Sequence, residues 1–135
     1  MSDQINYINP EGLFKSPAFS QAVTVQGKGK TIYIGGQNAA DAEAKLVGCD
    51  DIGKQTEQAM KNIQLILEAC GAGFQHLVKM TIFMVDGQDV MKGFEASQKF
   101  LGQSKNPPAV SVVKVAALGR PEYLVEIEGI AFLPE

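Results

Sequence analysis

The segment Val-Glu-Ile-Glu at 125–128 places two carboxylates where they could act together. Residues two apart in a β-strand point to the same face, roughly 6.6 Å apart along the chain, so Glu126 and Glu128 would share one face. A carboxylate on a mostly apolar face can serve as an acid, a base or a group that holds a water molecule. The alternative is that both side chains are solvated at the margin of a sheet. The rest of the predicted face is apolar: Leu124, Ile130 and Phe132.

Other residue types that do chemistry are scarce in this chain. His76 is the single histidine, so a His-rich metal site is excluded, and a surface position in a loop is the favoured interpretation. Cys70 falls on the apolar face of a predicted helix, where a thiol is inert, and Cys49 lies beside Asp50 and Asp51, which oppose thiolate formation. Neither glycine-rich nucleotide-binding motif is present. We therefore expect no metal ion and no cofactor.

The segment Asn-Pro-Pro-Ala-Val-Ser at 106–111 raises a question of its own. The double proline ends the preceding element, and an alternating run of β-branched residues begins at Val110. The start of a strand at the mouth of a site often carries a charged side chain, whereas this one is apolar. The segment alone leaves open whether it belongs to a site or to a hydrophobic edge.

Composition restricts the classes of function. The 135 residues fit one domain, which we take as 1–135. A net charge of −3, scattered lysines and a single arginine, Arg120, argue against binding of nucleic acid. No run approaches the roughly 18 apolar residues of a membrane span, and the polar N-terminus lacks the layout of a signal peptide. We expect a cytoplasmic protein with no membrane partner.

The elements that must position these residues alternate between strands and helices. Residues 19–27 and 30–37 read as a β-hairpin, and the Gly35-Gly36 pair inside the second strand indicates a bulge or a close approach to the backbone. A helix is predicted from Ile52, capped by Asp50-Asp51 and stopped by Gly71. The remaining expected elements are a central strand at 77–85, a helix at 89–101, and strands at 110–118 and 122–133.

This order predicts an α+β sandwich, with two helices on one face of a mixed sheet of five or six strands. Both faces of the central strand at 77–85 carry apolar residues, although two helices can cover only one face. The uncovered face must meet something, so we expect a homo-oligomer with sites between subunits.

Several segments together resemble the RidA (YjgF) family of reactive-intermediate deaminases, along nearly the full chain. They are FSQAV at 19–23, GGQ at 35–37, QTEQAMKNIQLILEACG at 55–71, LVKMTIFMVD at 77–86, PAVSVVKVAAL at 108–118 and VEIEGIA at 125–131. The resemblance implies a chorismate-mutase-like fold, a homotrimer and three clefts between neighbouring subunits. It also implies hydrolysis of enamines and imines to a 2-oxo acid and ammonia. Some members are described as ribonucleases, a role that the acidic charge here does not support.

The chain departs from the family at positions that the resemblance assigns to the substrate. The family has Pro-Ala-Arg-Ser where this chain has Pro-Ala-Val-Ser at 108–111, so Val110 stands at the position of the arginine. By the resemblance, that arginine holds the substrate carboxylate through two hydrogen bonds. Phe19 and Phe94 stand where the family has a tyrosine and an asparagine. The resemblance keeps Gly36, whose backbone lines the cleft, and Glu126, the carboxylate that positions the attacking water.

Three interpretations follow. The chain could be a divergent deaminase that uses Glu126 on an atypical, less anionic enamine or imine. It could instead be a non-catalytic trimer that binds a small molecule in apolar clefts. In the third, Phe19 and Phe94 fill the clefts and nothing binds. Two other basic residues are poor replacements for the missing arginine. Arg120 lies in a Gly-Arg-Pro turn that gives no reason to expect it at the site, and Lys114 lies about 13 Å along its strand from Val110.

Overall fold

The computed structural model describes residues 4–102 and 105–135. Within these residues six strands and two α-helices form an α+β fold, as the sequence predicts, together with one short 3₁₀ helix. The strands are β1 (Ile5–Ile8), β2 (Ala22–Val25), β3 (Gly29–Gln37), β4 (Leu77–Val85), β5 (Ala109–Val115) and β6 (Val125–Pro134). The helices are α1 (Ile52–Ala69), η1 (Phe74–His76) and α2 (Val90–Leu101).

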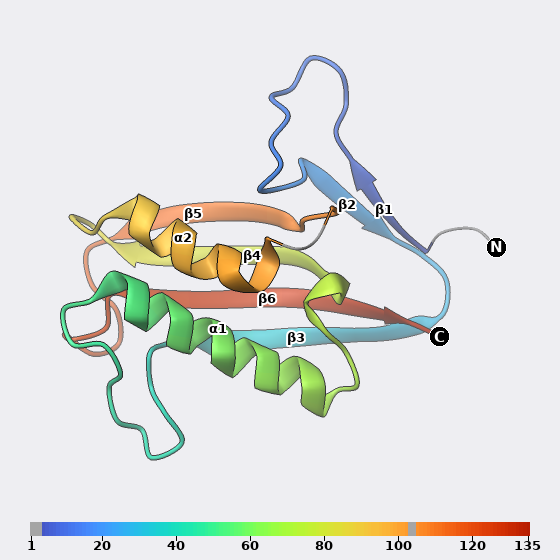
Figure 1. Cartoon of the computed structure of the whole chain (residues 1–135). Coiled ribbons are helices and arrows are strands. Elements are labelled where there is room, and N and C mark those ends of the chain that lie inside the picture. The colour runs from blue at the N-terminus through green and yellow to red at the C-terminus, as the bar shows by residue number, and fades with distance from the viewer. Residues whose placement is uncertain (1–3, 103–104) are drawn as a thin grey trace.

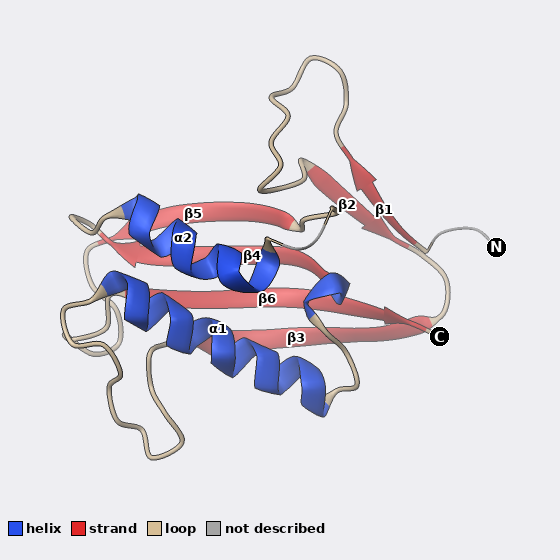
Figure 2. Ribbon diagram, in the orientation of Figure 1, coloured by secondary structure: helices blue, strands red, loops and turns tan. Residues whose placement is uncertain are grey.

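Four strands form the main sheet in the order β3-β6-β4-β5 (Figure 1). The pair β4–β5 is parallel and the other two pairs are antiparallel, so the sheet is mixed. Both helices lie against the same face, with α1 over β6 and β3 and α2 over β4 and β5 (Figure 2). The predicted arrangement of two helices on one face is therefore confirmed.

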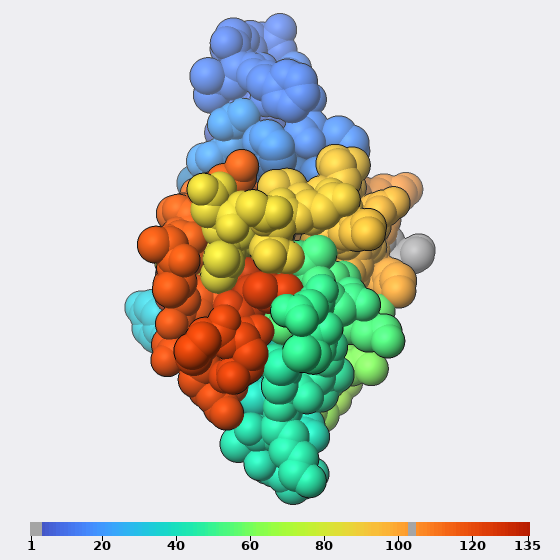
Figure 3. Space-filling model, turned by 90° about the vertical axis from the view of Figure 1, so that its left-hand side faces the viewer, coloured from blue at the N-terminus to red at the C-terminus, as the bar shows by residue number. Residues whose placement is uncertain are grey.

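The predicted hairpin between residues 19–27 and 30–37 is wrong. Both segments contain a strand, but β2 pairs with β1 and β3 pairs with β6, so the two are not partners. The β1–β2 pair forms a separate two-stranded sheet beside β5, where Ser20 and Ala109 make an isolated bridge. The chain between β1 and β2 projects beyond the rest of the molecule (Figure 3). Its exposed apolar residues include Leu13 and Phe14.

Both helix starts follow from their capping residues. The Asp51 carboxylate accepts a hydrogen bond from the backbone N–H of Lys54 at 2.9 Å, and Asp89 accepts from Met91 and Lys92 at the start of α2. Gly71, directly after the C-cap of α1, has φ +77°, a conformation that glycine adopts without strain. The predicted boundaries of both helices are confirmed to within a few residues.

The hydrophobic core lies between the helices and the main sheet. The apolar side of α1, with Met60, Ile63 and Leu67, packs on the residues of β3, β4 and β6 that point toward the helices. Each of these three side chains is at most 1% exposed. No helix in the described part of the chain is long and apolar enough to cross a membrane.

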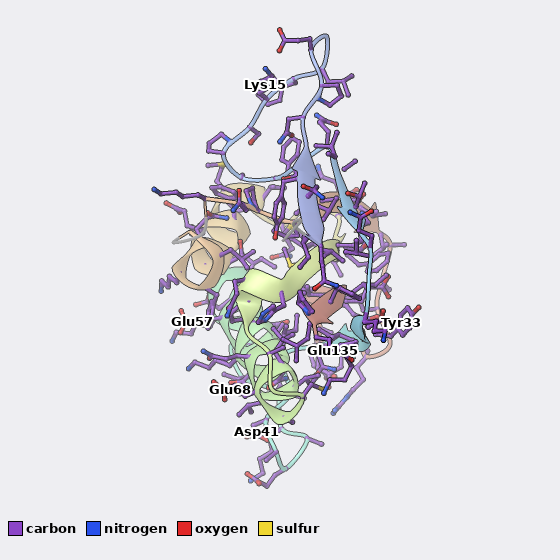
Figure 4. The ribbon with its side chains drawn as sticks, turned by 90° about the vertical axis from the view of Figure 1, so that its right-hand side faces the viewer. Lys15, Tyr33, Asp41, Glu57, Glu68 and Glu135 are labelled. Atoms are coloured by element: carbon purple, nitrogen blue, oxygen red, sulfur yellow. The ribbon has the colours of Figure 1, made fainter. Side chains whose placement is uncertain are left out.

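The opposite face of the main sheet, which we call the open face, has no helix over it. It carries Thr31 and Tyr33 of β3, which pair with Phe132 and Ile130 of β6. Tyr33 is 79% exposed and lies on the side of the molecule away from Glu57 of α1 (Figure 4). The face continues through Glu126 and Glu128 of β6. Its residues on the other two strands are Lys79, Thr81, Phe83 and Val85 of β4 and Ala109, Ser111, Val113 and Val115 of β5.

Candidate functional site

An apolar pocket of about 230 Å³ lies between α2 and the strands β4 and β5. Phe94 and Val112 at its edge are 40% and 52% exposed, so the pocket reaches the surface of a single chain. The lining includes Thr56, Ser97 and Gln98 but no charged side chain. The apolar lining residues are Ala18, Phe19, Met80, Ile82, Met84, Val90, Gly93, Phe94, Leu101, Val110 and Val112.

Strand register explains why Val110 faces this pocket. Val110 pairs with Met80 of β4, and Met80 pairs in turn with Gly129 of β6, so all three lie on the helix-covered face. The double proline ahead of the strand fixes the other wall. Ser20 donates its N–H to the Pro108 carbonyl at 2.9 Å and its hydroxyl to the Pro107 carbonyl at 2.6 Å. These bonds hold Phe19 beside β5.

Phe19, Phe94 and Val110, which sequence reasoning assigned to one site, are therefore brought together. They line an open space rather than fill it. The question raised by the segment at 106–111 has a structural answer: the start of β5 is one wall of a pocket, and that wall carries no charge.

Glu126 lies on the open face, on the other side of the sheet. It pairs with Phe83 of β4, whereas its neighbours Val125 and Ile127 point into the core. Asn38 donates its side-chain amide to Glu126 Oε1 at 3.0 Å, which fixes the orientation of the carboxylate. One chain alone does not bring Glu126 to the pocket.

Gly36 lies directly against the Glu126 side chain. A Cβ at this position would overlap the Glu126 carboxyl group and its Cγ, whereas a Cβ at Gly35 would meet nothing within 4 Å. The register between β3 and β6 shifts between Ile34 and Gln37, so the two glycines form a bulge. Both meanings predicted for the glycine pair, a bulge and a close approach, are confirmed.

Ser111 belongs to the open face and not to the pocket. It lies opposite Thr81 of β4, and its hydroxyl accepts a hydrogen bond from Lys79 Nζ at 2.9 Å. Glu128 lies on the other side of Thr81 and is exposed. The structure thus divides the predicted site residues between two faces: Phe19, Phe94 and Val110 line the pocket, and Gly36, Glu126 and Ser111 lie on the open face.

Sequence reasoning missed two residues, Thr56 and Asn38. Thr56 is four residues after Ile52 and four before Met60, both on the buried side of α1, so helical periodicity could have placed it facing the core. Its Oγ1 is buried, lines the pocket and has no hydrogen-bond partner among the described residues. Asn38 is 88 positions from Glu126, and no local pattern joins them.

The remaining candidates lie away from both groups. His76 Nδ1 accepts a hydrogen bond from the Gly73 N–H at 3.0 Å, and Cys70 is the half-buried cap of α1. Arg120 donates a hydrogen bond to the Tyr123 hydroxyl and forms an ion pair with Glu122, and these two interactions hold the pKa of Arg120 above its ordinary value. Arg120 is therefore engaged outside the pocket. The described residues contain no group of three or more His, Cys, Asp or Glu side chains that could hold a metal ion.

Comparison with known protein families decides the relationship. The sequence model of the family described as Endoribonuclease L-PSP, to which the RidA/YjgF proteins belong, matches residues 14–133. The chain belongs to this family. The resemblance to RidA proteins noted from the sequence is thus confirmed.

Individual relatives agree with this assignment. The chain is 36% identical to a RutC family protein of Pyrococcus abyssi over 114 residues, which cover 84% of this chain and 85% of that protein. It is 34% identical to the human 2-iminobutanoate/2-iminopropanoate deaminase over 113 residues, 84% of this chain and 78% of the relative.

Solved structures of Rid-family proteins share the fold. A Rid-family protein of Yersinia pestis superposes with a TM-score of 0.87 at 32% identity, covering 97% of this chain and all of the other. RidA from an Antarctic Psychrobacter gives a TM-score of 0.69 at 32% identity, with 98% and 100% covered.

Proposed function

We propose that this Rid-family chain hydrolyses an enamine or imine that is less anionic than a 2-imino acid, in clefts between subunits of a homotrimer. The apolar pocket carries the proposal. Val110 lies where the resemblance implies an arginine, and the whole lining is uncharged. The carboxylate of a 2-imino acid would be buried there without a partner, which is costly, whereas a neutral imine has no such charge.

The relative named 2-iminobutanoate/2-iminopropanoate deaminase supports the reaction class. Water adds to the carbon of the C=N bond, the resulting aminoalcohol loses ammonia, and a carbonyl product remains. Glu126 is the carboxylate that, by the resemblance, positions the attacking water. Asn38 orients its carboxylate, and Gly36 leaves the space that the carboxylate occupies.

The division of the site between two faces supports the homotrimer. Since Glu126 and the pocket lie on opposite faces of one sheet, Glu126 can act only at the pocket of another copy. The open face of a single chain leaves Tyr33 79% and Val113 40% exposed, which is apolar area that a neighbouring copy would cover. In this arrangement one copy supplies the pocket and its neighbour supplies Glu126.

A second function has its own support. No titratable side chain lines the pocket, so the pocket of one copy contains a binding surface but no acid or base. A trimer that binds a small molecule without turning it over would need nothing more. The two functions differ in what the replacement of Glu126 does.

The test compares two sets of imines generated in situ. An amino-acid oxidase supplies anionic 2-imino acids and an amine oxidase supplies neutral imines, and the carbonyl product is followed against the uncatalysed rate. Wild type should accelerate the neutral set more than the anionic set. Glu126→Gln should lower the catalysed rate by about 100-fold or more. Glu128→Gln, two residues away on the same face, should keep it.

Val110→Arg tests the pocket itself. The added guanidinium gives an anionic substrate its partner, so the preference should shift toward 2-imino acids. If wild type accelerates neither set but Val110→Arg accelerates the anionic one, the pocket serves a different ligand. Silence from both proteins would support the binding function and overturn hydrolysis.

A further inference from the structure

The helix-covered side of the sheet contains a buried polar atom without a partner. Thr56 is 2% exposed, and its Oγ1 makes no hydrogen bond to any residue that the structure describes. Buried polar groups in proteins are almost always hydrogen-bonded, so an unpaired hydroxyl needs an explanation. Thr56 lines the pocket, so the explanation lies in what the pocket holds.

The packing of the two helices directs this hydroxyl. Gly93 of α2 lies opposite Thr56 of α1, and a Cβ at Gly93 would lie 3.6 Å from Thr56 Oγ1 and would overlap Met84 Cε. The absence of a side chain at Gly93 therefore leaves room beside the buried Thr56 hydroxyl, and both residues line the pocket. Ser97, the other hydroxyl in the lining, donates to the Phe94 carbonyl at 2.8 Å. Thr56 is the one of the two with both its donor and its acceptor capacity unused.

The adjacent residue, Gln55, shows that buried polar side chains of α1 are not generally left without hydrogen bonds. Gln55 is fully buried, and its amide makes three hydrogen bonds, to the carbonyls of Gly48 and Glu122 and from the N–H of Leu124. Gln55, which joins α1 to the chain before β6, is thus satisfied. The other buried side-chain atom without a hydrogen bond among the described residues, Glu122 Oε1, has the Arg120 guanidinium as its ion-pair partner at 3.0 Å, whereas the Thr56 hydroxyl has no partner and belongs to a residue that lines the pocket.

We infer that the pocket takes a small neutral molecule with one ring or one branched chain and a single hydrogen-bonding group, and that Thr56 binds this group. The inference rests on the proposed use of the pocket as the ligand site, and it names the chemical class of the ligand. A dry cavity of about 150 Å³ accommodates benzene, so about 230 Å³ holds one ring with a short substituent. The apolar lining holds the ring and the Thr56 hydroxyl fixes its orientation.

The test uses probes that differ only in the hydroxyl. Phenol and benzyl alcohol are compared with toluene and ethylbenzene by titration calorimetry on the full-length protein. In Thr56→Val, which keeps the shape and loses the hydroxyl, the two alcohols should bind about fivefold to tenfold more weakly while the hydrocarbons keep their affinity. Thr56→Ser should retain the preference for the alcohols. Thr24→Val, on the exposed part of β2, should change nothing.

An NMR measurement on wild type alone complements the variants. Phenol should shift the Thr56 methyl resonance more than toluene does. Equal ratios of alcohol to hydrocarbon affinity in wild type and Thr56→Val overturn the inference, as does the absence of binding by all four probes. If wild type hydrolyses imines but Thr56→Val leaves the preference for the alcohols unchanged, this inference is overturned and the proposed function stands. If Thr56→Val removes the preference for the alcohols but wild type hydrolyses no imine, only the enzymatic part of the proposed function is overturned.

Discussion

The two faces of the main sheet carry opposite halves of one predicted site. The helix-covered face has a pocket without charge, lined by Phe19, Phe94 and Val110. The open face has a carboxylate held by a neighbouring amide, Glu126 with Asn38, beside a glycine that leaves room for it. Neither face is a complete site: the pocket can hold an apolar molecule but cannot move a proton, and the carboxylate can move a proton but has no pocket.

The difference teaches where changes in specificity and changes in chemistry can occur. A substitution in the pocket alters which molecule binds and leaves the carboxylate untouched. Under the proposed function, a substitution around Glu126 alters the reaction and leaves the pocket untouched. The difference between Val110 and the arginine that the resemblance implies belongs to the first kind, because it concerns an anion partner on a face that Glu126 does not share.

The largest expected effect is on stability, and it compares two adjacent buried residues of α1: Gln55, which is hydrogen-bonded, and Thr56, which is not. Gln55→Leu removes the partner of three backbone groups at the junction of α1 and the chain before β6. Each buried group left unpaired costs about 1–3 kcal/mol, so we expect a loss of about 3 kcal/mol or more in the free energy of unfolding. Thermal unfolding should show a midpoint lower by roughly 10 °C.

Two variants control this measurement. Gln64→Leu, on the exposed side of α1, should leave the midpoint nearly unchanged. Thr56→Val removes no hydrogen bond and should be neutral or stabilising. If Thr56→Val destabilised the protein as much as Gln55→Leu, the Thr56 hydroxyl would have a structural partner, and the contrast between paired and unpaired polar groups would be lost.

The next effect concerns the open face. Gly36→Ala forces the Glu126 side chain out of its place, because the added methyl would overlap its carboxyl group and Cγ, and the displaced carboxylate loses the hydrogen bond from Asn38. We expect hydrolysis to slow by about tenfold to 100-fold, since small misplacements of a reacting group cost up to that much. The free energy of unfolding should fall by only about 0.5–1.5 kcal/mol, the worth of one hydrogen bond, and binding of toluene in the pocket should be unchanged.

Gly35→Ala is the matched control, since a Cβ at that position meets nothing within 4 Å. An equal loss of rate in both variants would mean that the bulge itself, and not the position of Glu126, governs activity. A full rate in Gly36→Ala would separate Glu126 from the reaction.

Much of the fold could be predicted from local patterns. The cap at Asp50-Asp51 and the stop at Gly71 predicted the first helix, and the apolar run at 77–85 predicted the central strand of the sheet. Strand pairing was the error. Alternation identifies a strand but not its partner, and β3 finds its partner in β6, about a hundred residues later, rather than in the adjacent β2.

The candidate site was predictable only in part, for the same reason. The resemblance to the RidA family selected Glu126 and Val110, but the faces they occupy depend on registers that run through β4. Asn38 joins Glu126 only in the folded chain. Whether the Thr56 hydroxyl has a partner depends on residues of other elements, such as Gly93 of α2 beside it, so periodicity could bury Thr56 but could not show that its hydroxyl lacks a partner.

The smallest of the expected effects tests whether the open face meets another copy. Val113 is 40% exposed on that face, and Val113→Lys would place a charge where the proposed neighbour packs. A lysine can direct its charged end to solvent, so the dissociation constant should rise by about tenfold rather than become unmeasurable. Sedimentation velocity over a dilution series measures this shift. Leu65→Lys makes the same exchange at a residue 64% exposed on α1, away from the open face, and should leave association unchanged. If wild type and both variants are monomers throughout the dilution series, the open face is free in solution, Glu126 has no pocket within reach, and the proposed hydrolysis loses its geometry.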